Sequence, residues 1–169
     1  MPSDQELLSR IIDGDQNALA ALYHSYYQRL SRFLIRMLND PDLVVEVVND
    51  VFLVVWRKAA SYRGEASMSS WIIGIAYRKA LKALRKRRPW TPLDDVPAAA
   101  LASGEEAIAR LELDSSLARL SPEHRAVMEL TYFFGYSYRE IGEILECPEN
   151  TVKTRMFHAR RVLQSILEV

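Results

Sequence analysis

Apolar residues recur at intervals of three and four through most of the chain, which is the period of an amphipathic α-helix. The longest run of this kind begins at Asp15 and predicts one helix that continues to Leu38. Its apolar face is formed by Leu19, Leu22, Tyr23, Tyr26, Tyr27, Leu30, Phe33, Leu34, Met37 and Leu38. Similar spacing in the later segments predicts an all-α fold.

Capping signals mark where the other N-terminal helices begin. Ser3 and Glu6 have the spacing of a capping box and predict a short helix that ends near Gly14. Asp40 followed by Pro41 supplies an N-cap and a first-turn proline for a third helix.

The segment LVVEVVNDVFLVVW, residues 43–56, gives conflicting signals, because its valines favour a strand by propensity. Its polar residues nevertheless fall on one face of a helix, and we therefore predict a helix. These residues are Glu46, Asp50 and Arg57. The apolar surface is wider than one packing face requires. We expect either that Leu53 with Val54 or Val55 stays exposed for a partner, or that the helix lies at the centre of a bundle.

A basic helix is predicted from Ser70 through WIIGIAYRKALKALRKRR, and residues 78–88 hold seven cations and no acid. One face is apolar, with Ile73, Tyr77, Ala80, Leu81 and Leu84. Another face carries Arg78, Lys82 and Arg85, flanked by Lys79 and Lys86. Gly74 is the weak point of this prediction, since an interior glycine costs about 1 kcal/mol relative to alanine.

Residues 89–104 interrupt the helical pattern with three prolines and a glycine, which is typical of a linker. We therefore expect two small helical domains, at 1–88 and 105–169, joined by a flexible linker at 89–104. Four helical segments follow the linker. Ser121-Pro122 and the pair Ser137 and Glu140 supply caps, and a turn at 146–148 completes a helix-turn-helix.

The last helix, ENTVKTRMFHARRVLQSILEV, has one apolar and one polar face. The apolar stripe is Val152, Met156, Ala159, Leu163 and Ile166, and the opposite face carries Thr151, Lys153, Thr154, Phe157, His158 and Arg161. In a major groove, such polar side chains pair with base edges and cations pair with phosphates. A helix-turn-helix can also be a packing unit, but these groups favour DNA binding. The nearby acids Glu140, Glu143, Glu146 and Glu149 are then expected to face away.

The 22 basic and 22 acidic residues balance over the whole chain but are unevenly distributed. By count, residues 1–58 carry a net charge of −2, 59–90 carry +7, 91–150 carry −8 and 151–169 carry +3. Two basic blocks separated by an acidic one predict two cationic surfaces that can each meet a polyanion. Charge alone does not distinguish such surfaces from solvated helix faces.

Several function classes are disfavoured by composition. The longest apolar run, Val51 to Trp56, is too short to cross a bilayer, and the polar start lacks signal-peptide features, so we expect a cytoplasmic protein without membrane insertion. The single cysteine, Cys147, favours packing over redox sensing, and we expect no metal and no cofactor. The three histidines have no neighbouring thiol or carboxylate arrangement for catalysis, and no glycine-rich phosphate loop occurs. We expect no enzyme activity.

Two long stretches match a known family in order and spacing. The first runs from LYHSYYQRLSRFL through DPDLVVEVVNDVFLVVWRK to YRGEASMSSWIIGIAYRKALKALRK. The second is ARLSPEHRAVMELTYFFGYSYREIGEILECPENTVKTRMFHARRVL. They resemble regions 2 and 4 of the extracytoplasmic-function (ECF) sigma factors, the two-domain promoter-specificity subunits of bacterial RNA polymerase. The resemblance covers nearly the whole chain.

The resemblance implies that region 2 opens the minus-ten element and holds single-stranded DNA, whereas region 4 reads minus-35 duplex. It assigns Arg78, Lys79, Lys82, Arg85 and Lys86 to phosphates of the opened strand. It places Tyr62, Arg63, Met68, Trp71 and Ile75 around a flipped base. It also places Thr151, Lys153, Thr154, Phe157 and His158 at the minus-35 element, with Arg161 on a phosphate.

Protein partners are also implied by the resemblance. The helix from Asp42 to Lys58 would dock on the coiled coil of the largest subunit of core RNA polymerase. Its contact residues would be Glu46, Asn49, Asp50, Leu53 and Arg57. The acidic linker would thread toward the active centre and the RNA exit path. An anti-sigma factor, the usual regulator in this family, would cover the polymerase-facing and DNA-facing surfaces.

Four positions depart from the usual family pattern. Arg78 stands where many members have asparagine near the flipped base, and Asn49 stands for a common glutamine. Asn150 replaces a glycine before the recognition helix. His158 replaces a usual arginine, which leaves a weaker, pH-dependent cation near the minus-35 bases. These departures affect which promoter is read more than the fold.

A stand-alone helix-turn-helix regulator is the alternative interpretation. Such a protein would use the same C-terminal motif, usually as a symmetric dimer on a palindrome. It would not explain the basic helix that begins near Trp71, nor the long linker. A footprint without polymerase would distinguish the two.

Overall fold

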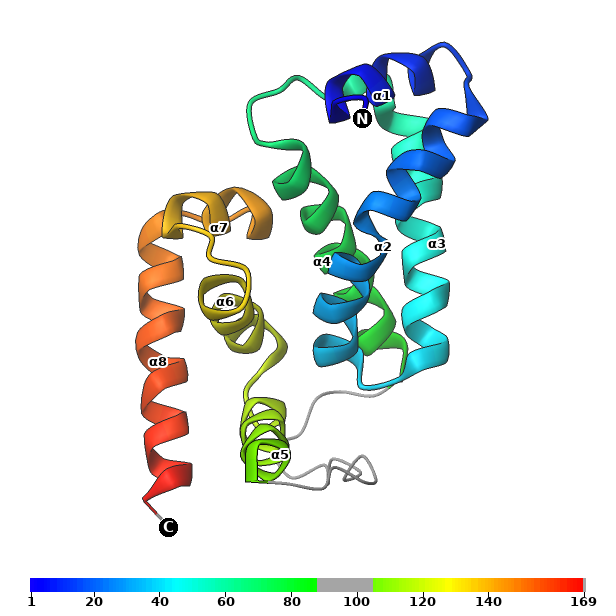
Figure 1. Ribbon diagram of the computed structural model, residues 1–169. Helices are drawn as coiled ribbons and strands as arrows, with labels where there is room; N and C mark the ends of the chain where they lie inside the picture. Colours follow the sequence, from blue (N-terminus) through cyan, green and yellow to red (C-terminus); the bar gives the residue numbers. More distant parts are fainter. Residues whose placement is uncertain (88–104, 169) are drawn as a thin grey trace. The chain divides into compact units, whose positions relative to one another are not determined.

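The computed structural model describes residues 1–87 and 105–168, except for the side chains of 105–111 and 167. This part of the chain contains eight α-helices, one short 3-10 helix and no strand (Figure 1). The helices form two compact units. The expected all-α fold is confirmed, whereas the expected linker at 89–104 lies outside the described residues.

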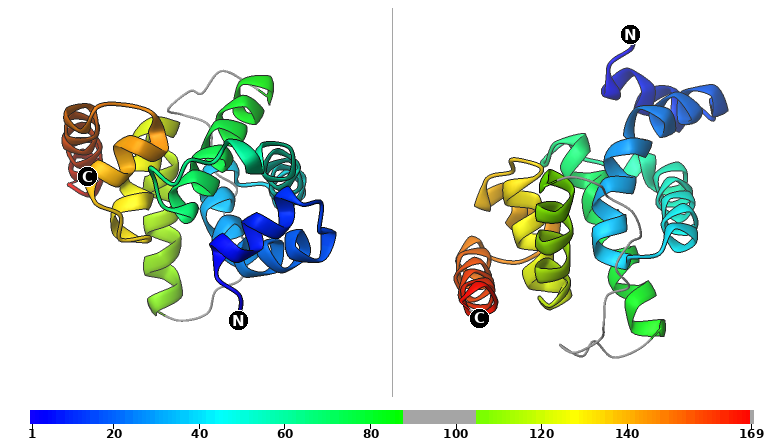
Figure 2. Two further views of the ribbon diagram at one scale, coloured as in Figure 1. Left: turned by 90° about the horizontal axis from the view of Figure 1, so that it is seen from above. Right: turned by 60° about the horizontal axis from the view of Figure 1, so that its bottom comes forward.

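The N-terminal unit contains α1 to α4, which can be followed from two further directions in Figure 2. Its elements are α1 (Asp4–Ile12), α2 (Gln16–Leu38), α3 (Pro41–Lys58), the 3-10 helix η1 (Ala59–Ser61) and α4 (Met68–Arg87). Helix α2 packs along α3 and against α1, and η1 contacts both α1 and α3. The long helix predicted from Asp15 to Leu38 is thus the centre of this unit.

The predicted caps form the first turns of these helices. The N–H of Glu6 donates to Ser3 Oγ at 3.2 Å, and the N–H of Ser3 donates to Glu6 Oε2 at 2.6 Å, which completes the capping box. Asp15, predicted only as the start of the long helix, is also a cap, because its Oδ1 accepts the N–H groups of Asn17 and Ala18. Asp40 Oδ1 accepts the N–H of Leu43 at 3.0 Å. Each carboxylate or hydroxyl satisfies a backbone donor that the helix itself leaves without a partner.

The valine-rich segment is helical because burial outweighs strand propensity. Val48, Val51 and Val55 are fully buried in α3. Full burial of such a side chain contributes about 1.5–3 kcal/mol, whereas a valine costs a helix at most about 0.7 kcal/mol relative to alanine. Leu53 is 45% exposed, as expected. Of the two valines expected to be exposed beside it, Val54 is half-buried. The alternative, Val55, was wrong because it is fully buried.

Helix α4 begins at Met68, earlier than the predicted Ser70. The reason is a cap that the sequence pattern did not reveal, since Ser67 Oγ accepts the N–H of Ser70 at 3.0 Å. The helix then continues without interruption through Gly74 to Arg87. Gly74 therefore does not break the basic helix.

The C-terminal unit contains α5 (Glu105–Ala118), α6 (Pro122–Tyr132), α7 (Tyr138–Leu145) and α8 (Glu149–Leu167). Ser121 Oγ caps α6 by accepting the N–H of His124 at 3.2 Å. The capping box of α7 is also present, with Ser137 N donating to Glu140 Oε2 at 2.8 Å. Helix α8 packs on α6 and α5, and α7 and α8 form the predicted helix-turn-helix.

A close backbone approach sets the turn between α7 and α8. Glu146 has a left-handed φ of 54°, and Cys147 N donates to the carbonyl of Gly142 at 3.0 Å. A Cβ at Gly142 would lie 2.8 Å from the carbonyl oxygen of Cys147. The turn therefore requires glycine at position 142, which fixes the direction in which α8 leaves α7.

A buried arginine joins α5 to α6. Arg125 is only 7% exposed, and its guanidinium donates to the carbonyls of Leu117, Ala118 and Leu120 at 2.9, 2.7 and 3.1 Å. Burial lowers the pKa of Arg125, while the carboxylate of Glu129 on the same helix raises it. The side chain supplies donors to the last carbonyls of α5, which lack intrahelical partners.

Candidate nucleic-acid and polymerase-binding surfaces

The cations predicted on α4 form a stripe along its C-terminal half. Arg78, Lys82, Arg85 and Lys86 are exposed, and Lys79 is half-buried. Arg85, Lys86 and Arg87 also occupy the last turn, where positive charge is favoured by the helix dipole. The dipole accounts for the end of the stripe but not for Arg78 and Lys82, which lie further back on the helix. The stripe therefore carries cations that the helix dipole does not explain.

The loop that precedes α4 is held by an aromatic pair. The rings of Tyr62 and Trp71 lie 5.1 Å apart between centroids, and the Tyr62 hydroxyl donates to the carbonyl of Ala66 at 2.6 Å. Burial, and to a smaller degree the carboxylate of Asp4, raises the pKa of Tyr62. Met68 is buried beneath the start of α4. Four of the five residues predicted around a flipped base thus belong to one ordered loop and the first turn after it.

Arg63 and Ile75, two members of that set, differ in their exposure, since Ile75 is only 5% exposed. Arg63 is exposed in the loop. Ile75 lies on α4, one helical turn after Trp71. The set therefore combines a cation at the surface with aromatic and apolar side chains from consecutive turns.

A groove of about 450 Å³ lies between α2 and α3. Its lining is mostly apolar and comprises Gln16, Leu19, Tyr23, Asn49, Phe52, Leu53 and Trp56. Asn49 and Leu53 were predicted to contact polymerase. Glu46, Asp50 and Arg57, the other predicted residues, lie on the same helix; Glu46 and Arg57 are exposed, and Asp50 is half-buried.

Tyr23 organises one wall of this groove. Its ring lies 4.9 Å from that of Phe52 and 5.5 Å from that of Tyr27, and its hydroxyl donates to Asn49 Oδ1 at 3.2 Å. Burial raises the pKa of Tyr23, and Tyr27 adds to the rise. Asn49 is thereby fixed in orientation by a residue of the neighbouring helix.

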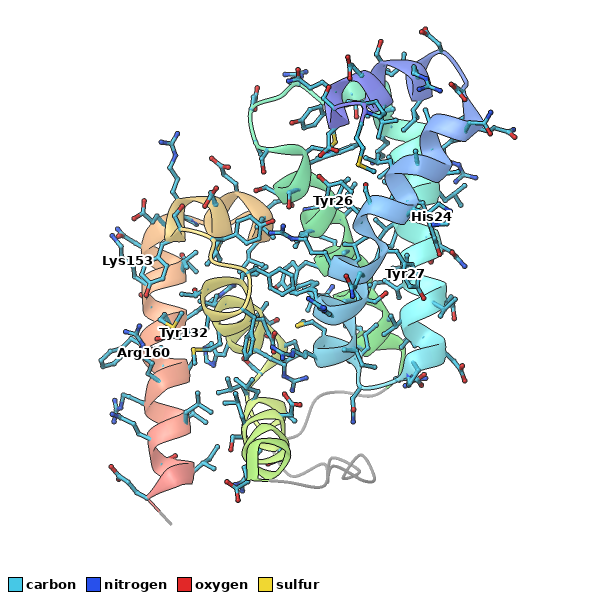
Figure 3. The ribbon with its side chains drawn as sticks, in the orientation of Figure 1. His24, Tyr26, Tyr27, Tyr132, Lys153 and Arg160 are labelled. Atoms are coloured by element: carbon cyan, nitrogen blue, oxygen red, sulfur yellow. The ribbon has the colours of Figure 1, made fainter. Side chains whose placement is uncertain are left out.

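Sequence reasoning missed the part of this groove that α2 provides. Figure 3 marks Tyr26 and Tyr27, which are adjacent in sequence and differ in burial. Tyr26 is buried and its hydroxyl donates to Asp4 Oδ2 at 2.5 Å, whereas Tyr27 is exposed. Leu19, Tyr23 and Tyr27 recur every fourth residue, which was the available signal for a second apolar stripe beside the core stripe.

The polar face predicted on α8 is present. Lys153, Thr154, His158 and Arg161 are exposed, Phe157 is 58% exposed, and Thr151 is half-buried. The guanidinium of Arg161 lies 5.8 Å from the centroid of the Phe157 ring. Two cations, a threonine and two aromatic rings therefore share one accessible helix face.

The expectation that the nearby acids face away was wrong for Glu149. Its carboxylate lies 3.1 Å from Lys153 Nζ, one turn along α8 (Lys153 is marked in Figure 3). Glu140 instead accepts the N–H of Ser137 and completes the cap of α7. A phosphate that approaches Lys153 must therefore compete with an exposed ion pair, whose contribution to stability is small.

A hydrogen bond joins the end of α6 to α8. The Tyr132 hydroxyl accepts a hydrogen bond from Arg160 Nη2 at 2.9 Å, and both residues are marked in Figure 3. This bond raises the pKa of Arg160. Tyr132 and Phe133 are exposed beside it. Sequence reasoning assigned no role to this pair.

The described residues contain neither a metal-binding cluster nor a membrane-spanning helix. Within 1–87 and 105–168, no group of three or more His, Cys, Asp and Glu side chains is placed to hold a metal ion. No helix in that part of the chain is both long and apolar enough to span a bilayer.

Comparison with known proteins identifies both units. The family model for Sigma-70 region 2 matches residues 22–89, and the model for Sigma-70 region 4 matches residues 110–163. The ECF RNA polymerase sigma factor SigM of Mycobacterium tuberculosis is 36% identical, over 98% of this chain and 85% of its own length. The RNA polymerase sigma-H factor of Pseudomonas aeruginosa is 28% identical, over 98% of this chain and 94% of its own.

Solved structures share the fold. CnrH in complex with the cytosolic domain of CnrY has a TM-score of 0.74 at 22% identity, covering 98% of this chain and 97% of that one. The sigma factor RpoE bound to the anti-sigma factor NepR, from Bartonella quintana, has a TM-score of 0.68 at 23% identity, covering 84% and 91%. Both region models match in order, and a 36% identical relative aligns with 98% of this chain. The chain therefore belongs to the ECF family of RNA polymerase sigma factors.

Proposed function

We propose that this sigma factor divides promoter recognition between α4 in its N-terminal unit and α8 in its C-terminal unit. Family membership makes it a non-catalytic subunit that directs promoter-specific transcription by RNA polymerase. A stand-alone regulator is not favoured, because the region 2 match at 22–89 covers a module that such a protein does not need. The single observation that carries the proposal is a cationic stripe on α4 together with an exposed polar face on α8.

The α4 surface holds the opened minus-ten strand in this proposal. Arg78, Lys79, Lys82, Arg85 and Lys86 bind successive phosphates, since single-stranded DNA is gripped by cations beside aromatic platforms. The Tyr62–Trp71 pair stands where a base leaving the stack can be received. Arg63, Met68 and Ile75 complete that pocket. The hydrogen bond from Tyr62 to Ala66 supports it, because a held loop loses less conformational entropy on binding.

The α8 face reads the minus-35 duplex. Thr151, Lys153, Thr154, Phe157 and His158 approach base edges and thymine methyl groups, and Arg161 binds a phosphate. The exposure of Phe157 supports this role, because an aromatic ring left in water is unfavourable unless a partner covers it.

Core polymerase binds α3 and the groove beside it. The groove is apolar at its centre, with Leu53, Phe52 and Trp56, and carries Glu46 and Asp50 further along the same helix. This combination fits an amphipathic helix that presents an apolar ridge flanked by cations, such as the coiled coil of the largest polymerase subunit. Asn49 and Arg57 add polar contacts at the rim.

An anti-sigma factor is proposed as the regulator of this chain. Two of the fold relatives were solved with such a protein or with a cytosolic domain bound to them. The exposed side chains of the α2–α3 groove and of α8 are the surfaces that it would need to cover. Since core polymerase and the chromosome lie in the bacterial cytoplasm, we place the protein there. That the acidic linker at 89–104 threads into the polymerase channel stays a prediction.

In vitro transcription tests the proposal. Purified sigma factor is added to core polymerase with a genomic template pool, and the 5′ ends of the transcripts are mapped. We expect start sites that share two spaced sequence elements. Starts no more frequent than those of core polymerase alone would contradict the proposal. Tight protection of duplex DNA by the free protein, without polymerase, would favour the stand-alone regulator instead.

A further inference from the structure

Two of the three histidines in the chain lie against each other at the DNA-reading surface. His124 is on the first turn of α6 and His158 is on α8, and their rings are stacked with centroids 6.1 Å apart and planes inclined by 27°. His158 is exposed and His124 is half-buried. The third histidine, His24, is exposed on α2 in the other unit (Figure 3). The chain thus contains both a histidine pair and an isolated histidine for comparison.

The orientation of His158 is set by rings on two sides. His124 stacks on it from α6, and Phe157 meets it edge-on at 5.6 Å between centroids. His124 is itself anchored, because its backbone N–H is bound by the Ser121 cap. The imidazole of His158 is therefore held on the same face of α8 as Lys153 and Thr154.

The charges around the two histidines disfavour protonation of both rings at once. The pKa of His124 is lowered first by burial and then by His158, and Arg155 on α8 acts in the same direction, while Glu123 on α6 opposes them. Other charged groups exposed on α8 are Arg161, the Lys153–Glu149 ion pair, and Arg160, which donates to the Tyr132 hydroxyl. Two cations at this separation repel each other, so protonation of one ring makes protonation of the other less favourable.

We propose that His158 takes up a proton when α8 binds the minus-35 duplex, and that His124 is a positioning residue that holds its ring there. The inference rests on the proposed function, since it needs α8 to meet DNA. Phosphates bring negative charge to the helix face and so favour the charged imidazole. A protonated imidazole offers two N–H donors to a phosphate or to a guanine edge.

The sign of the pH effect follows from linkage. If the complex holds one more proton than the separate molecules, affinity rises as pH falls, by at most about tenfold per pH unit. We expect promoter binding to be about three- to tenfold tighter near pH 6 than near pH 8 through this residue alone.

The experiment uses holoenzyme and a labelled promoter fragment taken from the strongest start site mapped by the transcription test. Dissociation constants are measured across the pH range at constant salt. H158R is the reference, because arginine keeps its charge throughout. The ratio of the wild-type constant to the H158R constant should fall as pH falls. H158Q should bind weakly at every pH, and H24Q should behave as wild type.

Variants of His124 test the positioning role. H124A removes the stacked ring and should flatten the pH response while leaving affinity near pH 8 within about twofold. H124F restores an aromatic ring without a titratable group and should restore the response. An H124A response equal to that of wild type would overturn the role of His124. Equal thermal melting of the variants excludes a folding defect.

Two outcomes separate this inference from the proposed function. Wild-type holoenzyme that binds the mapped promoter with the same pH dependence as H158R would overturn the proton linkage and leave the sigma-factor function standing. Failure to map any promoter would contradict the function, and the inference with it. Ring NMR of the free chain adds an independent check, because H158Q should raise the titration midpoint of His124. An unchanged midpoint would refute the coupling between the two rings.

Discussion

At the residue scale, Arg125 is the side chain on which the C-terminal unit most depends. It is buried, and its guanidinium binds three backbone carbonyls at the junction of α5 and α6. A buried cation is tolerated only when such partners replace water. The arginine also offsets the charge of Glu129, which is fully buried one turn later.

Replacing Arg125 with methionine should lower the free energy of unfolding by about 3 kcal/mol. The carbonyls at the end of α5 lose their donors, and the Glu129 carboxylate loses a compensating charge. Urea denaturation of the full chain measures the change. R119M removes an exposed arginine nearby and is the control. Equal stability of the two variants would show that the carbonyl contacts contribute little.

Gly142 is the second such residue, because the turn between α7 and α8 depends on it. G142A places a methyl group 2.8 Å from the carbonyl oxygen of Cys147, so the turn before α8 must shift. We expect a loss of about 1–3 kcal/mol in stability and weaker promoter binding by holoenzyme. E112A, at an exposed position on α5, should change neither. Promoter binding unchanged in G142A would mean that the turn does not set the pose of α8.

At the element scale, α4 combines packing and charge in one helix. Its N-terminal half includes Trp71, which contacts Tyr62, and its C-terminal half presents the cations. Because the stripe extends beyond the last turn, the helix dipole alone does not explain it. Binding to the opened minus-ten strand is the role proposed for these cations.

The double variant K82A/R85A should impair strand opening more than initial duplex binding. Loss of two phosphate contacts removes counterion release, and we expect about a fivefold or greater fall in open complex. Permanganate reactivity of unpaired thymines measures opening, and a mobility shift measures binding. R32A/K58A removes two exposed cations from other helices of the same unit as a control. A permanganate pattern equal to wild type would refute the assignment of the stripe.

The pair α2 and α3 forms the other functional element. The groove needs both helices, since the Tyr23 ring of α2 contacts the Phe52 ring of α3 and the Tyr23 hydroxyl donates to Asn49. Leu53 is 45% exposed and belongs to the apolar lining of this groove.

L53D should weaken binding to core polymerase by about tenfold or more, because a carboxylate would be buried in an apolar contact. Fluorescence anisotropy of labelled sigma factor with core polymerase measures the constant. I12D changes an equally accessible apolar residue, 51% exposed on α1 and outside the groove lining, and should bind normally. If L53D and I12D bind alike, the groove is not part of the polymerase interface.

At the scale of the whole molecule, features within one helical turn could be predicted from the sequence, whereas contacts between packed helices could not. The caps at Ser3 and Asp40 follow from spacing, because each acts within one helical turn. The groove and the contacts of Arg125 depend on residues that meet only after helices pack. Glu149 was misplaced because the i,i+4 spacing on a helix brings its carboxylate beside the cation of Lys153.

The proposed division of the chain predicts how the two units cooperate. Fragments 1–88 and 105–169, mixed at equal concentration, should each fold as helices but direct at least about a hundredfold less transcription than the intact chain. Tethering makes the second promoter contact intramolecular, and separation loses that effective concentration. Circular dichroism reports folding, and run-off transcription from a mapped promoter reports function. Transcription by the mixed fragments equal to that of the intact chain would show that each unit finds polymerase independently. An unfolded fragment would place the domain boundary elsewhere.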